Sequence, residues 1–174
     1  MTFRVLTICA AAALALSACH KAGGSGDGPT GPKMSDAGTP EAQAFMAKTA
    51  KEPGVVTLPD GLEYRIVHSG PTTGMKPHLQ DEVKIMYEGK LIDGTVFDSS
   101  YDRGQPAAFP LKQLVPAWQE ALPLMRPGDE WILYVPPKLG YGSEGNEKIP
   151  PGSALIFRIE LIDVLPGPGT VQAG

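Results

Sequence analysis

The feature that most constrains the fold of this chain is an alternation of apolar and polar side chains. It occurs in three separate segments, at residues 62–66, 83–87 and 155–161. Successive side chains of a strand point to opposite faces of a sheet, so a period of two indicates strands with one buried face. One-sided burial is typical of antiparallel sheets. The sequence therefore predicts an antiparallel sheet built from distant parts of the chain.

Turn sequences and a fourth apolar run extend this pattern. Asp93 and Gly94 separate two apolar runs, which predicts a hairpin closed by a type I′ turn. Residues 131–135 form another apolar run, and the turn sequence 127–129 precedes it. We expect at least four strands.

A single short helix is expected between these strands. Apolar residues at positions 111, 114, 115, 118 and 122 have helical spacing, and Trp118 lies on the apolar face. Pro116 is tolerable only in the first turn, and Pro123 ends the run. The fold class is therefore α+β, with the antiparallel sheet wrapped around one helix of about two turns.

The start of the chain is typical of an export signal. Arg4 precedes the apolar run from Val5 to Leu16, and small residues end at Cys19. The run is short for a membrane span, so an uncleaved anchor is the lesser alternative. The ending Leu-Ser-Ala-Cys is similar to the lipobox of bacterial lipoproteins, which predicts cleavage after residue 18 and lipidation of Cys19. Ordinary cleavage with an incidental Cys19 is the other interpretation.

The remaining boundaries follow from composition. Residues 19–40 are rich in glycine and proline and predict a flexible tether. Residues 41–57 predict a short helical lead-in, with Thr39 as a possible N-cap and Pro40 at the first helical position. This helix is too short to form a coiled-coil dimerisation arm with heptad repeats, so we expect a monomer. The folded domain is placed at 58–165 and a flexible tail at 166–174.

Several classes of function are disfavoured. A formal net charge of −4 gives no indication of nucleic-acid binding. The three histidines lack metal-ligand spacing, and solvated surface is their default interpretation. Residues 140–145 fit G-x-G-x-x-G, but the following Ile-Pro-Pro prevents the helix that a nucleotide site requires. No serine lies in a nucleophile elbow. We expect neither a metal nor a cofactor.

Aromatic residues gather at the ends of elements and in loops. By pattern alone they are either the core of a small domain or the lining of a binding pocket.

Five segments closely resemble the FKBP family of peptidyl-prolyl cis-trans isomerases. They are 83–89 (VKIMYEG), 93–100 (DGTVFDSS), 114–118 (LVPAW), 141–142 (YG) and 149–157 (IPPGSALIF). Their order and spacing match over roughly residues 58 to 165. Residues 58–64 (LPDGLEY) further resemble the start of the isomerase domain in exported bacterial members such as the macrophage infectivity potentiator group.

The resemblance implies a five- or six-stranded antiparallel half-barrel around the short helix, with a substrate proline bound between helix and sheet. The catalytic positions that it implies are Asp98, Tyr141, Phe97 and Trp118. The substrate-binding positions are Tyr87, Val115, Ile149, Phe157, Arg103, Phe109 and Leu114. Trp118 would form the pocket floor, and Arg103 would orient Asp98. The alternative role for Asp98 is a turn residue that caps Ser99 or Ser100.

Three positions depart from the family pattern, all expected at the pocket rim. Ala107 replaces a usual phenylalanine, Asn146 a frequent histidine, and Lys148 a common apolar residue. These changes are expected to alter which residue is preferred before proline and how well the macrolides tacrolimus and rapamycin bind.

The implied function is an isomerase for proline-containing unfolded or nascent exported polypeptides. It would be anchored to the membrane through Cys19, by analogy at the outer membrane facing the periplasm. The alternative is a proline-binding or holdase chaperone module with little turnover. A surface factor that contacts host proteins is a third hypothesis, which rests on group analogy alone.

Overall fold

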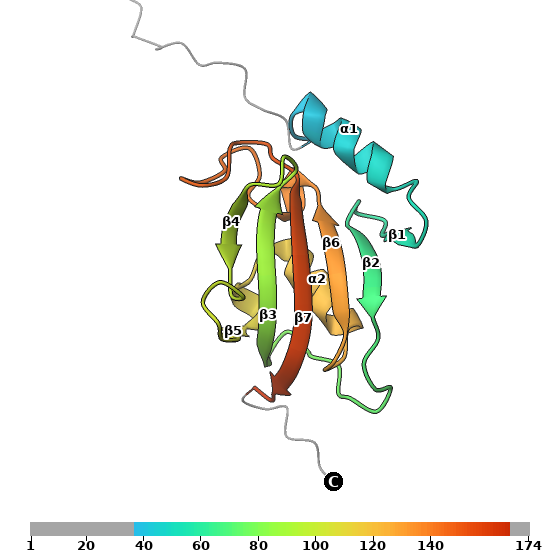
Figure 1. The fold of residues 1–174 in the computed structure, drawn as a ribbon, viewed down its shortest axis with the longest axis vertical. Helices are drawn as coiled ribbons and strands as arrows, with labels where there is room; N and C mark the ends of the chain where they lie inside the picture. The colour runs from blue at the N-terminus through green and yellow to red at the C-terminus, as the bar shows by residue number, and fades with distance from the viewer. Residues whose placement is uncertain (1–36, 168–174) are drawn as a thin grey trace, which may run out of the picture. The chain divides into compact units, whose positions relative to one another are not determined.

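A computed structural model describes residues 37–167, which form one antiparallel sheet and a few short helices (Figure 1). The strands are β1 (Val55–Thr57), β2 (Glu63–His68), β3 (Glu82–Leu91), β4 (Val96–Ser99), β5 (Ala107–Pro110), β6 (Glu130–Val135) and β7 (Leu155–Leu165). The α-helices are α1 (Pro40–Thr49) and α2 (Pro116–Ala121), and the 3-10 turns are η1 (Leu111–Gln113), η2 (Leu122–Leu124) and η3 (Pro137–Leu139). The order in the sheet is β1-β2-β6-β7-β3-β4, and β5 also pairs with β3.

The sheet therefore contains seven strands in the described range, whereas five or six were expected. The antiparallel architecture around one short helix is confirmed. The difference has two sources. Strand β1 has only three residues, which is too short to show an alternation. Strands β4 and β5 are separate strands that pair with different parts of β3.

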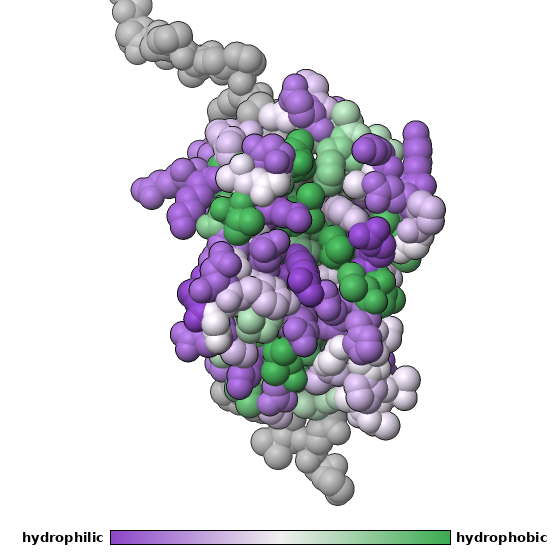
Figure 2. Space-filling model, viewed as in Figure 1, coloured by the Kyte–Doolittle hydropathy of each residue, from purple (hydrophilic) through white to green (hydrophobic). Residues whose placement is uncertain are grey.

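The long pair β3–β7 forms the centre of the sheet. Val83, Ile85 and Tyr87 lie opposite Val164, Leu161 and Ile159, and these six side chains are buried on one face. The alternation in both segments thus predicted the correct buried face. Lysine, glutamate and arginine side chains of these strands point the other way, and Figure 2 shows this outer face as largely hydrophilic.

The inner face packs against α2, which lies behind the sheet in Figure 1. Fully buried residues of this layer include Leu111 and Leu122 from the 3-10 turns that flank α2, and Leu133, Leu155 and Ile159 from the sheet. Burial of one such side chain contributes roughly 1.5–3 kcal/mol, so this layer is the main source of stability. Pro116 begins α2 at its first turn, as predicted, and the helix is only six residues long.

Strands β4 and β5 pair with different parts of the same edge of β3. Ser100 fills the gap between them. Its backbone N–H donates to the Tyr87 carbonyl at 2.9 Å, and its hydroxyl accepts from the Tyr87 N–H at 2.7 Å. Ser100 is fully buried, so this bridge continues the ladder beyond β4 and fixes the position of Asp98 at the end of that strand.

The predicted type I′ turn at Asp93-Gly94 is wrong. The Gly94 N–H donates to the Leu91 carbonyl at 3.0 Å, and the Leu91 N–H donates to the Thr95 carbonyl at 2.9 Å. This is a three-residue loop closed by a glycine bulge, with Gly94 at a φ of 91°. The loop is one residue longer than expected, and the pairing of β3 with β4 is irregular beside it.

Strand β2 departs from its apparent alternation. Glu63 is buried, and its Oε2 lies 2.5 Å from the Thr49 hydroxyl of α1, whereas Ile66 is 48% exposed. Burial raises the pKa of Glu63. The tertiary position of α1 explains the inversion, because this helix covers a sheet face that the sequence alone leaves open to water.

The lead-in is not helical throughout, because β1 occupies its end and pairs with β2. Helix α1 begins at Pro40, and the Thr39 hydroxyl accepts from the Ala42 N–H at 3.1 Å, as expected for an N-cap. The Thr39 N–H donates to the Gly152 carbonyl at 3.0 Å, which joins α1 to the loop before β7. In the expected tail, the Gly167 N–H donates to Asp81 Oδ1 at 3.0 Å.

The predicted signal, the predicted lipidation site Cys19 and most of the predicted tether lie outside the described residues. Within residues 37–167, no helix is long and apolar enough to cross a membrane. The same range contains no cluster of His, Cys, Asp or Glu that could hold a metal ion. His68 and His78 are exposed.

Candidate active site

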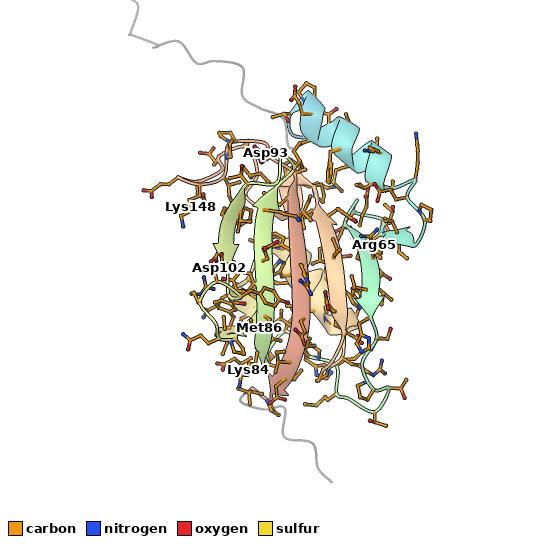
Figure 3. All side chains as sticks on the ribbon, viewed as in Figure 1. Arg65, Lys84, Met86, Asp93, Asp102 and Lys148 are labelled. Carbon is orange, nitrogen blue, oxygen red and sulfur yellow. The ribbon has the colours of Figure 1, made fainter. Side chains whose placement is uncertain are left out.

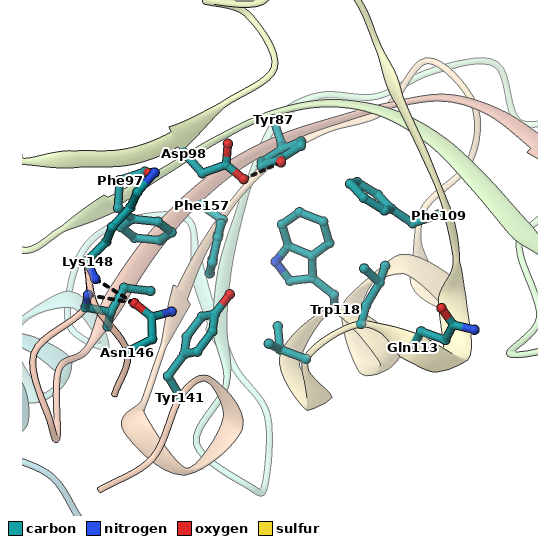
Figure 4. Close-up of a pocket in the computed structure, with 13 residues that line it drawn as sticks. Tyr87, Phe97, Asp98, Phe109, Gln113, Trp118, Tyr141, Asn146, Lys148 and Phe157 are labelled. Atoms are coloured by element: carbon teal, nitrogen blue, oxygen red, sulfur yellow. Dashed lines mark hydrogen bonds between the residues drawn. The ribbon is translucent and has the colours of Figure 1, made fainter. Parts of the chain in front are cut away.

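Helix α2 supplies the floor of a cavity between helix and sheet. Trp118 is 5% exposed, and its ring lies in edge-to-face contact with Tyr87 and Phe157, at centroid distances of 5.3 and 5.1 Å. Such contacts stabilise aromatic pairs by about 0.5–1.5 kcal/mol beyond burial. The indole is therefore held by strands on two sides (Figure 4).

The walls are aromatic rings carried by neighbouring strands. Phe97 of β4 meets Phe157 of β7 edge-to-face at 5.7 Å, and Tyr87 of β3 meets Phe109 of β5 at 6.0 Å. Gly89 makes this packing possible. A Cβ atom there would lie 2.6 Å from Phe97 Cε2 and 2.7 Å from Phe157 Cε1, so both rings rest against bare backbone.

A polar triangle forms one edge of the cavity. The Tyr87 hydroxyl donates to Asp98 Oδ2 at 2.5 Å, Arg103 Nη1 donates to Asp98 Oδ1 at 2.5 Å, and Arg103 Nη2 donates to the Tyr87 oxygen at 2.9 Å. Partial burial opposes ionisation of Asp98, but these hydrogen bonds outweigh it and hold the pKa of the carboxyl below its usual range. Asp98 is therefore an ionised, oriented carboxylate at neutral pH.

The Tyr87 hydroxyl remains protonated and serves as a donor. Burial raises the pKa of Tyr87, and the hydrogen bond to Asp98 raises it further, whereas Arg103 lowers it. The alternative role of Asp98 as a local turn cap does not account for this contact, because its carboxylate reaches across to β3.

The long loop between β6 and β7 closes the other side. Tyr141 is 38% exposed, and burial together with the charge of Asp98 raises the pKa of its hydroxyl. Asn146 Oδ1 accepts from the backbone N–H groups of Lys148 and Ile149, each at 2.9 Å. Ile149 is buried, so this turn pins an apolar residue into the cavity while Lys148 stays exposed.

Together these residues enclose a cavity of about 430 Å³, within the usual size of small-ligand sites. Its lining consists of Tyr87, Phe97, Asp98, Phe109, Gln113, Leu114, Val115, Trp118, Tyr141, Asn146, Lys148, Ile149 and Phe157.

The structure brings the predicted site residues together, with one difference. Arg103 does not line the cavity but contacts it through Asp98 and Tyr87. Of the positions that depart from the family pattern, Asn146 and Lys148 line the cavity. Ala107 of β5, which pairs with Ile85 of β3, does not line it.

Sequence reasoning missed two residues. Gln113 lines the cavity from η1, and no motif pointed to it. Gly89 supports the two phenylalanine rings; a glycine inside an otherwise regular strand is a signal of close approach and could have been used.

No serine, histidine or cysteine is found among the described residues that line the cavity. The site thus offers aromatic surface, one fixed carboxylate and hydroxyl donors, which suit non-covalent binding of an apolar group attached to a polar chain. The class defined by this fold and site is a small half-barrel domain with an aromatic cavity on a single helix.

Comparison with known proteins assigns the family. The sequence profile described as "FKBP-type peptidyl-prolyl cis-trans isomerase" matches residues 73–162, and the profile of the "domain amino terminal to FKBP-type peptidyl-prolyl isomerase" matches residues 32–66. The chain belongs to the family of FKBP-type peptidyl-prolyl cis-trans isomerases.

Relatives agree with this assignment. The chain is 52% identical to the peptidyl-prolyl cis-trans isomerase Mip of Coxiella burnetii over 71% of its own length and 54% of that protein. It is 44% identical to the outer membrane protein MIP of Legionella longbeachae over 76% and 56%. The crystal structure of FkpA from Escherichia coli superposes with a TM-score of 0.70 at 43% identity, over 74% of this chain and 59% of that one. The chain thus spans little more than half of these relatives.

Proposed function

We propose that this protein catalyses the cis–trans isomerisation of X-Pro bonds in polypeptides. The observation that carries the proposal is the aromatic cavity floored by Trp118, whose size and apolar walls fit a proline ring. Family membership supports the same activity, and the relative from Coxiella burnetii bears that activity in its name.

An apolar site suits this reaction because no covalent bond forms or breaks. Rotation about the X-Pro bond removes amide resonance, with a barrier of about 18–20 kcal/mol. The planar amide is more polar than the twisted one, so an apolar cavity favours the twisted state relative to the planar state. Trp118 and Phe97 supply this environment.

The polar residues then act by orientation. The Tyr141 hydroxyl, protonated at neutral pH, is a donor for a substrate carbonyl, which would hold the peptide in a bent conformation. Asp98, fixed by Tyr87 and Arg103, places its carboxylate beside the twisting amide. The remaining apolar lining residues act as substrate-binding surface: Val115, Ile149, Phe157, Phe109 and Leu114.

The proposed substrates are proline-containing unfolded or nascent polypeptides in the cell envelope. We propose that the protein is exported and anchored through Cys19 at the outer membrane. The name of the Legionella longbeachae relative, outer membrane protein MIP, supports this location. We also propose that part of a macrolide such as tacrolimus or rapamycin binds in this cavity. A monomer remains the proposed state.

The activity is tested on the full chain carrying Cys19→Ser, which removes the proposed lipid acceptor. Conversion of a proline tetrapeptide is followed for this protein and for Trp118→Ala, Asp98→Asn and Asp102→Asn. Asp102 is the matched control, since it lies exposed in the loop after β4 and does not line the cavity (Figure 3).

We expect catalysis by the parent and by Asp102→Asn, and a fall of at least about tenfold for Trp118→Ala and Asp98→Asn, equivalent to a loss of about 1.4 kcal/mol. A folded parent protein that isomerises the tetrapeptide no faster than the uncatalysed background would refute the proposed isomerase activity. If that protein still suppressed aggregation of an unfolded client, the holdase alternative would stand.

A further inference from the structure

Two charged side chains line the cavity, and they differ in how their charge is balanced. Asp98 is paired with Arg103. Lys148 takes part in none of the ion pairs found within residues 37–167. Its Nζ lies 3.4 Å from the Phe97 carbonyl oxygen, a neutral acceptor. The mouth therefore carries one positive charge that no described carboxylate offsets by direct contact.

The backbone at Lys148 is fixed although its side chain is exposed. The Lys148 N–H donates to Asn146 Oδ1, and the next residue, Ile149, is buried in the cavity wall. Gly145 makes the tight turn possible with a φ of +63°, because a Cβ there would lie 2.2 Å from the Ile149 carbonyl oxygen. The loop thus aims the stem of Lys148 along the rim, where its long stem lets the ammonium group reach a bound chain.

The two carboxylates of this loop lie outside the cavity lining. Glu144 and Glu147 are exposed and do not line the cavity. The Asp98 carboxylate on the facing strand is occupied by Arg103 and Tyr87. A negatively charged substrate group at the cavity mouth would therefore interact with the Lys148 ammonium group, and no unpaired carboxylate among the described lining residues would compete with it for that contact.

We propose that Lys148 is a specificity-determining residue that favours proline segments with an acidic side chain directly before or after the proline. Adjacent Cα atoms are about 3.8 Å apart, so a neighbour of a proline bound on Trp118 lies at the cavity mouth. This inference rests on the proposed function and names the substrate class of the same site. The contact forms with planar and twisted peptide alike, so it acts on KM more than on kcat.

The test uses the full chain with Cys19→Ser and two peptide series that carry Glu, Gln or Lys before or after proline. The measured quantity is the ratio of kcat/KM for Glu over Gln. We expect a ratio of roughly two to five on at least one side of the proline, as for a solvent-exposed ion pair. The ratio should fall toward one in 1 M salt, where the screening length is about 3 Å.

Variants assign the effect to one side chain. Lys148→Gln should bring the ratio to about one, and Lys148→Glu should reverse the preference toward Lys peptides. Glu147→Gln, a charge change in the same loop outside the cavity lining, should keep the parental ratio. Ratios near one on both sides in the parent, or a preference that survives Lys148→Gln, would overturn the proposal.

Failure of the proposed function is distinguishable from failure of this inference. If no peptide is turned over, the dissociation constants of the same Glu and Gln peptides are measured by tryptophan fluorescence, since Trp118 forms the floor. A Glu preference in binding that Lys148→Gln removes would support the role of Lys148 in a non-catalytic site, and equal binding would refute it.

Discussion

Replacing Gly89 by alanine tests whether the aromatic wall depends on bare backbone in β3. The added Cβ would lie 2.6 and 2.7 Å from the rings of Phe97 and Phe157. Carbon atoms prefer separations of about 3.5–4.0 Å, so the rings or the strand must move by about 1 Å. Overpacking of this kind costs about 1–3 kcal/mol.

The sign of the effect is informative because the usual expectation is the opposite. The φ of Gly89 lies outside the left-handed region, so alanine is compatible with the backbone. At such positions Gly→Ala normally stabilises a protein by about 0.4–1 kcal/mol through the unfolded chain. Combining both terms, we expect a net loss of roughly 1–2 kcal/mol in the free energy of unfolding, together with reduced isomerase activity.

Urea unfolding followed by circular dichroism measures the change. With a slope of about 1–3 kcal/mol per molar urea, the midpoint should fall by roughly 0.3–2 M. Phe97→Ala provides the control, because removal of that ring relieves the close approach to Phe97 and leaves only the one to Phe157. In that background Gly89→Ala should cost less, with a coupling above about 0.5 kcal/mol. A stabilised single variant, or strict additivity of the two changes, would refute the packing argument.

Three further changes probe the fixed carboxylate, a titrating pair and the junction of α1. Tyr87→Phe should raise the pKa of Asp98, because a hydrogen bond that favours its ionised form is lost. NMR titration of that carboxyl measures the shift, and an unchanged pKa would contradict the assigned contact. A hydrogen bond to Asp60 raises the pKa of Glu120 to about 7. The folded state then binds more protons than the unfolded one above about pH 4.3, so stability should fall as pH rises from 5 to 8. Glu120→Gln should remove this contribution, and identical pH profiles of the urea midpoints would count against it. Gly38→Ala should destabilise the fold by at least about 1 kcal/mol, since its φ is +79° and a Cβ would approach a neighbouring proline ring to 2.4 Å. An unchanged unfolding midpoint would show that this junction is loose.

Whether apolar alternation indicates the buried face of a strand depends on how that strand is covered. In β3 and β7 one face is buried against the helix layer and the other meets water, so alternation indicated the correct inner face. In β2 the pattern failed, because Glu63 is buried by α1 and Ile66 lies where little covers the sheet. Periodicity reports burial only where a single layer covers the strand.

The candidate site shows a similar division. The motifs placed Trp118, Phe97 and Asp98 in a site by resemblance, and the structure brings them around one cavity. The hydrogen bond from Tyr87 to Asp98 joins residues of two strands, and no local pattern indicated it. Nor did spacing show that Lys148 would face the cavity mouth without a paired carboxylate.

Local rules therefore determined the class of fold, the helix starts at Pro40 and Pro116, and the choice of inner face in the longest strands, because these depend on neighbours along the chain. Tertiary structure alone decided the burial of Glu63, the ring contacts on Gly89 and the charge left at the mouth. Each of these depends on which distant segment packs against the residue, and a one-dimensional pattern does not contain that information.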